Sequence, residues 1–346
     1  MLSNLKLKNF RRFFDYQINT NSNFTIICGD NATGKTSILE AMYLLSTAKS
    51  PRTNDLTSLI NDQSMFSIIE ATYNENRYKV ILSKNGKAAY VNDVEYKKIS
   101  DFIAGILVVM FTPKDLNLII GGRSERRKFF DLMISLCDKK YMTLLSEYKN
   151  VLKERNEILK QYTTANKLIL DVVSDNLANL GEKITTRRQK FIDLLNNYIQ
   201  IISKKLNFEN IKVNYLPSIE KDYKLNLENK LNYDLLTKST SVGPHRDDYG
   251  FEICDKEATE YASQGQMRSI VICLKLALKE VCELCNKKEV ILLLDDVFAE
   301  LDKNRQKELV LYLLEQKQTF ITTTTLKEIP NEILQKANIL KLWKEV

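Results

Sequence analysis

The chain has 346 residues, of which 44% are hydrophobic and 27% are charged, and Lys and Arg outnumber Asp and Glu by 51 to 44. This composition excludes a disordered chain and predicts a folded core of one large domain or two moderate ones. No apolar stretch reaches the roughly 18 residues of a membrane span, and the N-terminus lacks the apolar segment of a secretory signal. We therefore expect a cytoplasmic protein without a membrane partner. A net charge of +7 does not by itself identify a nucleic-acid binder.

The first motif along the chain is a phosphate-binding loop. Residues 2–7 alternate like a strand, residues 24–28 read as a buried strand, and residues 37–45 read as a helix. Between the last two lies a segment that fits G-x-x-x-x-G-K-[ST], in which backbone N–H groups cradle phosphates. Lys35 is expected to reach the β- and γ-phosphates and to act in catalysis, and the Thr36 hydroxyl is expected to bind Mg²⁺. The predicted nucleotide contacts are Gly29, Asp30, Asn31, Ala32, Thr33, Gly34, Lys35, Thr36 and Ser37.

The middle of the chain changes from strand patterns to helix patterns. Residues 66–73 and 78–82 read as antiparallel strands, with Asn85-Gly86 as a hairpin turn. From Arg123 to about Leu206 the apolar residues recur every 3.6 positions, which predicts a helical lobe whose helices have at most roughly 40 residues. Basic residues on this lobe could neutralise DNA phosphates, although a solvated helix face explains each of them as well. The candidates are Arg126, Arg127, Lys128, Arg187 and Arg188.

A short polar element, Ser263-Gln264-Gly265-Gln266, precedes a long helical pattern from Ile270 to Cys285. Ser263 is a good helix N-cap, and Gly265 would let the backbone approach an anion. Because the chain already has its own phosphate loop, we expect Ser263, Gly265 and Gln266 to bind the γ-phosphate held by a second copy of the protein. A capped core helix remains the alternative.

An apolar strand over residues 289–294 ends in two carboxylates. Asp295 is expected to hold Mg²⁺ together with Thr36, and Asp296 is expected to orient or deprotonate the attacking water. A solvated strand end would look similar. The strand over residues 319–324 should end near the phosphates, where Thr322 or Thr324 could sense the γ-phosphate.

Several motifs in this order resemble the RecF family of bacterial recombination-repair ATPases, which have an ABC/SMC-like head. Beyond the segments above, the resemblance rests on residues 5–11, 50–52, 111–116, 126–131, 243–248 and 295–302. It implies an α/β fold, with an ABC-type P-loop ATPase head of mixed sheet and helices and an inserted helical lobe. The head would comprise residues 1–112 and 207–346, and the arm residues 113–206. It also implies that Asp302 and a basic residue at Arg11 or Arg12 lie near the nucleotide.

The resemblance further implies a weak, DNA-stimulated ATPase that uses ATP and Mg²⁺. An ATP-dependent homodimer would bind double-stranded or gapped DNA, work with the RecO and RecR mediators, and help to load the strand-exchange recombinase in DNA repair and replication. Two residues depart from the family pattern: Ala32 replaces a usual glycine, which should strain the loop, and Met267 replaces a usual glutamine. The alternatives are the nucleotide-binding subunit of a transporter and a P-loop kinase.

Two other features have no assigned chemistry. His245 lies in Gly243-Pro244-His245-Arg246-Asp247-Asp248, where a structural turn and a catalytic group are equally compatible with the residues. Cys282 and Cys285 form C-x-x-C inside a predicted helix, and without a second cysteine pair we interpret them as buried thiols of a reducing compartment instead of zinc ligands.

Overall fold

The computed structural model describes residues 1–53, 55–98, 102–103, 105–298 and 301–343. The chain forms two compact units. The first comprises Met1–Asp115, Ile202–Phe208 and Ile272–Val346, and the second comprises Leu116–Ile201 and Glu209–Val271. Two helices, α6 (Lys167–Lys205) and α10 (Gln264–Asn286), contribute residues to both units.

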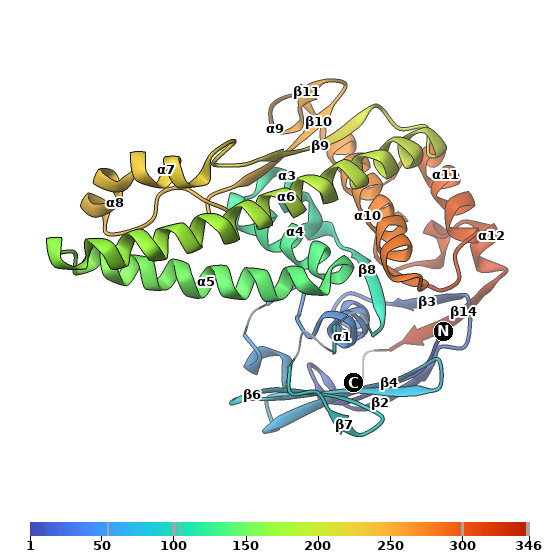
Figure 1. Ribbon diagram of the computed structural model, residues 1–346. Helices are drawn as coiled ribbons and strands as arrows, with labels where there is room; N and C mark the ends of the chain where they lie inside the picture. The colour runs from blue at the N-terminus through green and yellow to red at the C-terminus, as the bar shows by residue number, and fades with distance from the viewer. Residues whose placement is uncertain (54, 99–101, 104, 299–300, 344–346) are drawn as a thin grey trace. The chain divides into compact units, whose positions relative to one another are not determined.

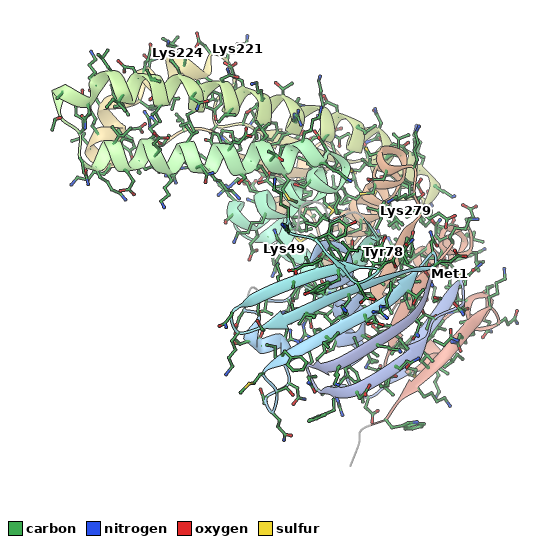
Figure 2. All side chains as sticks on the ribbon, turned by 60° about the horizontal axis from the view of Figure 1, so that its bottom comes forward. Met1, Lys49, Tyr78, Lys221, Lys224 and Lys279 are labelled. Atoms are coloured by element: carbon green, nitrogen blue, oxygen red, sulfur yellow. The ribbon has the colours of Figure 1, made fainter. Side chains whose placement is uncertain are left out.

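An antiparallel sheet of six strands forms one layer of the first unit, and Figure 2 shows its strands side by side. In the order in which they pair, the strands are β2 (Phe13–Asn19), β1 (Leu2–Phe10), β4 (Phe66–Tyr73), β5 (Asn76–Ser83), β6 (Gly86–Val91) and β7 (Val94–Glu95). The predicted strand is confirmed, but the alternation holds only from Leu5 onward, where Leu5 and Leu7 are buried and Lys6 is exposed. Between Leu2 and Asn4 the pairing with β4 shifts register. The alternation places apolar side chains on the core face of the sheet.

The predicted pairing of residues 66–73 with 78–82 is also confirmed, with Ile69 opposite Val80. The hairpin turn lies one position earlier than predicted. Ser83 pairs with Gly86, so the two turn residues are Lys84 and Asn85, and Gly86 already belongs to β6. The Asn-Gly pair therefore marks the turn, but its glycine is the first residue of the next strand.

The second layer of the first unit is a parallel sheet of five strands. Their order is β14 (Ala337–Leu342), β3 (Phe24–Gly29), β13 (Thr319–Thr323), β12 (Val290–Asp295) and β8 (Leu107–Phe111). All six residues of β12 are buried, as expected for a strand covered on both faces. The carboxyl ends of β3, β13 and β12 are therefore neighbours at one edge of the sheet, in that order.

Helix α1 (Lys35–Thr47) lies between the two sheets (Figure 1). Its residues Ile38, Leu39, Met42 and Leu44 are fully buried. A helix that is apolar around its whole circumference needs apolar partners on all sides, and the two sheets provide them. Among the described residues, the other helical elements of this unit are the 3₁₀ turns η1 (Thr57–Leu59) and η5 (Leu326–Glu328), the helices α11 (Lys303–Leu314) and α12 (Asn331–Leu334), most of α10 and the end of α6. The 3₁₀ turn η2 (Pro113–Leu116) crosses the unit boundary.

The second unit is mainly helical, as predicted for residues 123–206. Its elements are α3 (Asn117–Ile120), α4 (Arg123–Cys137), α5 (Lys139–Lys160), η3 (Thr164–Asn166), most of α6, β9 (Ile211–Leu216), α7 (Tyr223–Asn229), α8 (Leu231–Thr237), β10 (Asp248–Ile253), β11 (Lys256–Glu257), α9 (Ala258–Tyr261) and the start of α10. Helix α6 has 39 residues, which agrees with the predicted upper length. Strands β9 and β10 pair antiparallel, and Lys224 of α7 pairs with Asp175 of α6 at 2.8 Å.

Two buried ion-pair networks hold the interior of the second unit. Arg188 of α6 contacts Asp247 at 2.7 Å and Asp131 at 2.8 Å. Arg155 of α5 contacts Asp234 at 2.8 Å. Because these charges are shielded from water, each depends on its partner to offset the cost of desolvation. Among the residues described in either unit, no helix is long and apolar enough to cross a bilayer.

Candidate nucleotide-binding site

The phosphate loop between β3 and α1 has a geometry that only its glycines allow at two points. Gly34 has φ of 99°, and a Cβ atom there would lie 2.7 Å from the Phe13 ring. A Cβ at Gly29 would lie 2.5 Å from the carbonyl oxygen of Leu342. The buried Lys35 donates hydrogen bonds from Nζ to the carbonyl oxygens of Gly29 (2.7 Å) and Asp30 (3.0 Å). The lysine therefore folds back over the loop that precedes it.

Ala32 carries the strain that its sequence position predicts. Its φ is 66°, in the left-handed region that costs a residue with a Cβ about 1–2 kcal/mol. The Arg12 guanidinium donates a hydrogen bond to the Ala32 carbonyl oxygen. This contact fixes the top of the loop from the hairpin between β1 and β2.

The carboxyl ends of the parallel strands bring together side chains that are far apart in the sequence. The Thr36 hydroxyl lies 3.0 Å from both carboxylate oxygens of Asp295. The Thr322 hydroxyl donates to Asp295 Oδ1 at 2.7 Å and accepts from the Asp296 N–H at 3.1 Å. Since β13 lies between β3 and β12, Thr322 links the loop side of the site to the acidic strand.

Burial gives Asp295 an unusual electrostatic environment. Its side chain is 5% exposed, and desolvation raises its pKa above the ordinary value. Hydrogen bonds from Thr322 and Thr36 oppose this shift, and the charges of Arg52 and Lys35 oppose it less. Among the described residues, Asp295 has no ion pair. A hydroxyl and a carboxylate are the hard oxygen ligands that Mg²⁺ prefers, so this pair fits such an ion.

Asp296 follows with φ of 51°, a strained conformation for a residue with a side chain. Strain of this kind often occurs where function fixes the backbone. The predicted motif continues through Ala299 and Glu300, which lie outside the described residues. Asp302 caps α11 by accepting hydrogen bonds from the N–H groups of Asn304 and Arg305, both at 3.0 Å. A nucleotide contact by Asp302 stays a prediction.

Glu40 is a residue to which sequence reasoning assigned no role. It is fully buried on α1 and accepts a two-pronged contact from Arg11, with distances of 3.0 and 2.8 Å. Ser50 and Arg52 also contact its carboxylate. A single glutamate in the apolar run of residues 38–42 was the available signal. Arg11 is therefore held by α1 directly behind the phosphate loop.

The Ser263 element forms the N-terminus of α10 in the second unit. The Ser263 hydroxyl accepts from the Gln266 N–H at 3.3 Å, and the Gln266 side chain accepts from the Ser263 N–H at 2.9 Å. This reciprocal arrangement is a capping box, and it confirms Ser263 as the predicted N-cap. Cys282 and Cys285 lie on the same helix as predicted, and Cys282 is buried. The prediction of a buried thiol is wrong for Cys285, which is exposed.

The five basic residues predicted to contact DNA differ in their surroundings. Arg126 forms a fork with Asp248 at 2.8 and 2.9 Å, and Arg187 pairs with Asp138. Lys128 is exposed, and Arg127 is half-buried.

Arg188 corrects the prediction. It is 1% exposed and its guanidinium is bound to two carboxylates, so it does not reach a DNA phosphate. Arg188 therefore stabilises the interior of the second unit. This could not be predicted, because nothing in the sequence distinguishes Arg188 from its neighbour Arg187.

His245 has a structural environment. Its Nε2 lies 3.0 Å from the Thr240 carbonyl oxygen and its Nδ1 lies 2.8 Å from the Tyr148 hydroxyl. The carbonyl can only accept, so Nε2 carries the proton and Nδ1 accepts from Tyr148. Burial lowers the pKa of His245 to about 4, which keeps the ring neutral. These contacts favour a structural turn over a catalytic group for this motif.

Comparison with known proteins identifies the family. Residues 1–341 match the RecF/RecN/SMC N terminal domain. The DNA replication and repair protein RecF of Lactobacillus johnsonii is 38% identical, over 98% of this chain and 96% of its own length. RecF of Acholeplasma laidlawii is 37% identical, over 93% of both chains. The chain belongs to the RecF family.

Solved structures agree with this assignment. A structure of the recombination mediator protein RecF with ATP superposes with a TM-score of 0.88 at 31% identity, covering 95% of this chain and 93% of the other. The Smc head domain of Pyrococcus furiosus, at 15% identity and a TM-score of 0.54, shares the fold. The predicted ABC-type fold and the predicted recombination-repair ATPase are thereby confirmed at the level of the RecF family, and the transporter and kinase alternatives are not favoured.

Proposed function

We propose that this RecF-family protein binds ATP on the Gly29–Thr36 loop and Mg²⁺ between Thr36 and Asp295, and that it uses ATP hydrolysis as a switch for DNA binding. The observation that carries the proposal is the 3.0 Å contact between Thr36 and Asp295, which are 259 positions apart in the chain. The RecF relative solved with ATP supports the choice of nucleotide.

The side chains of this chain divide the work of hydrolysis. Lys35 leaves its two carbonyl partners and places its ammonium on the β- and γ-phosphates. Asp296 orients the attacking water and accepts its proton, while Thr322 holds both Asp295 and the Asp296 backbone in place. When bound, Mg²⁺ supplies positive charge that stabilises the charge developing on the phosphate oxygens.

A second copy of the protein completes the site. Ser263, Gly265 and Gln266 of that copy contact the γ-phosphate, and Asp302 lies at the edge of the nucleotide. Two observations support this: Ser263 is exposed at a helix N-terminus, and such a terminus favours anions. ATP then stabilises the dimer because it binds the closed pair better than the open monomers.

The closed dimer holds double-stranded or gapped DNA, works with the RecO and RecR mediators and helps to load the strand-exchange recombinase, while slow, DNA-stimulated hydrolysis releases it. Support comes from the solved relative described as a recombination mediator protein of the RecFOR pathway. In this proposal residues 1–112 and 207–346 act as the ATPase head and residues 113–206 as the arm, so the head includes Glu209–Val271, which belong to the second compact unit. A cytoplasmic location follows from a role on DNA.

The test is the solution mass of the Asp296→Asn protein with Mg²⁺-ATP, with and without a gapped duplex. We expect a monomer that becomes a dimer only with ATP and then retains the duplex. The Ser263→Arg/Asp296→Asn double variant is the matched control, and it should bind ATP but stay monomeric. A dimer that forms equally well without nucleotide, or a monomer at saturating ATP, would refute the proposal.

A further inference from the structure

The second unit has a basic cavity, and the residues that line it are far from the phosphate loop in the sequence. The cavity has a volume of about 600 Å³. Four of the side chains that line it are cationic, five carry hydroxyl groups, and none is acidic. The lining residues are Arg123, Arg127, Ser218, Lys230, Tyr233, Thr237, Ser239, Ser241, Val242 and Arg246.

Most of the positive charge in this cavity is not neutralised by the protein. Arg123 lies 3.3 Å from Asp248, which is already held by the fork of Arg126. Among the described residues, Arg127, Lys230 and Arg246 form no ion pair. Three cations that converge on one hollow repel each other, so the cavity favours an anion.

Arg127 is held in place at the wall of the cavity. Its guanidinium donates to the Asp247 carbonyl oxygen at 2.7 Å, which fixes its position. Burial lowers the pKa of Arg127 and the charge of Arg188 lowers it further, while the charges of Asp248, Asp131 and Asp247 oppose this shift. A bound anion would offset the cost of burying this guanidinium.

The wall of the cavity is pre-organised by hydrogen bonds. Ser218 donates to the Gly243 carbonyl at 2.9 Å and accepts from the Gly243 N–H at 2.7 Å. The Ser241 N–H donates to Asp234 at 2.9 Å, and Asp234 is in turn held by the buried Arg155. The Ser241 hydroxyl is buried and has no hydrogen-bond partner among the described residues. A buried hydroxyl without a partner is costly to the fold.

We propose that this cavity binds a phosphate group of a nucleic acid, with Arg127, Lys230 and Arg246 as its cationic contacts. The inference rests on the proposed DNA-binding function and gives it a site. It keeps Arg127 of α4 from the predicted DNA contacts and joins it to residues 218–246 in one concave surface, in place of the other predicted positions on α4 and α6. Guanidinium groups and hydroxyls together match the oxygens of a phosphate. The phosphate is either an internal one of the backbone or the terminal one at the edge of a gap.

The experiment compares the full-length protein with a Lys230→Gln/Arg246→Gln variant, using a fluorescent gapped duplex and Mg²⁺-ATP over a series of salt concentrations. Both side chains are exposed, so the variant should keep its fold and its ATPase rate without DNA. We expect weaker binding and a fall of about 2 in the slope of log K against log salt, since each lost phosphate contact removes about 0.9. The matched control, Lys149→Gln/Lys153→Gln, removes the same charge from exposed positions on α5 and should leave the slope within about half a unit of the wild-type value.

The two sources of phosphate are separated by the ends of the gap. If the cavity holds a terminal phosphate, replacing the 5′-phosphate at the gap by a hydroxyl weakens DNA binding by the wild-type protein and leaves DNA binding by the variant unchanged. If it holds an internal phosphate, that replacement affects neither protein.

Two other outcomes would overturn the inference, and they differ from each other. If the variant binds DNA with the wild-type slope, the cavity is not a phosphate site although the proposed function stands. In that case, we would compare the two proteins on immobilised poly-glutamate. If the wild-type protein is retained and the variant is not, the cavity binds acidic protein segments. If the wild-type protein binds no DNA at any salt concentration with Mg²⁺-ATP, the proposed function fails together with the inference.

Discussion

Asp295 of the first unit and Asp247 of the second are both buried carboxylates, but their partners differ. Asp247 is 2% exposed and faces the Arg188 guanidinium at 2.7 Å. Asp295 is 5% exposed, is bound by two threonine hydroxyls, and has no ion pair among the described residues. A paired buried charge holds a fold together, whereas an unpaired one is maintained for something that binds to it. In the proposed function Asp247 is therefore the structural acid and Asp295 is the one that serves a ligand.

The largest effect on stability is expected from removing the cation that pairs with Asp247. An Arg188→Met substitution leaves the buried Asp247 and the half-buried Asp131 without their cation, so the free energy of unfolding should fall by about 3–5 kcal/mol. Urea denaturation measures this. The neighbouring Arg187→Met is the control, and it should cost less than about 1 kcal/mol because its pair with Asp138 is partly exposed. Equal losses for the two variants would contradict the structural role.

The functional side is tested by Lys35→Ala. ATP affinity should fall by at least roughly 100-fold, about 2.7 kcal/mol, because the ammonium is the main cation of the phosphate loop. Calorimetric titration of the folded variant measures this, with the exposed Lys84→Ala as the control. Unaltered ATP affinity would refute the assignment of the loop.

An Asp295→Asn substitution sharpens the comparison, because it should stabilise the protein while it abolishes hydrolysis. Burial raises the pKa of Asp295, so the folded state holds its proton more tightly than the unfolded state. The charged carboxylate therefore lowers stability above the raised pKa, and this penalty disappears as the pH falls below the ordinary value of 3.8.

We thus expect the Asn variant without nucleotide to gain on the order of 1 kcal/mol at pH 7, and the gain to shrink towards pH 4. Thermal unfolding at a series of pH values measures this. A loss of stability at neutral pH would show that Asp295 is structural, like Asp247.

The smallest effect concerns the strained loop. Ala32→Gly should raise the free energy of unfolding by about 0.5 kcal/mol, since glycine accepts the φ of 66° but loses more entropy on folding. ATP turnover measured alongside would show whether the strain slows hydrolysis. Ala88→Gly in β6, where φ is ordinary, is the control and should lower stability.

Much of the nucleotide site could be predicted because local sequence fixes local geometry there. The loop between a strand and a helix and the acidic strand end needed no knowledge of distant contacts. The strand over residues 319–324 was also predictable, and its register then placed Thr322 beside Asp295.

What could not be predicted depends on pairing across the chain. Glu40 and Arg11 are 29 positions apart in the sequence, and Arg188 and Asp247 are 59 positions apart. A charged residue carries no mark of its partner, so the sequence alone could not separate a buried arginine from a solvated one. The cavity was missed for the same reason, since its cations come from two distant segments.

The order of the parallel sheet has a consequence for synthesis on the ribosome. Strand β3, which carries the phosphate loop, pairs only with β13 and β14 among the described strands, and both come after residue 318. The nascent chain therefore carries an apolar strand without neighbours until nearly 300 further residues have been translated. Such a strand is prone to pairing with the wrong partner. The same arrangement means that a chain ending before β13 lacks part of the nucleotide site, so under the proposed function such an incomplete copy would not enter the ATP-dependent dimer.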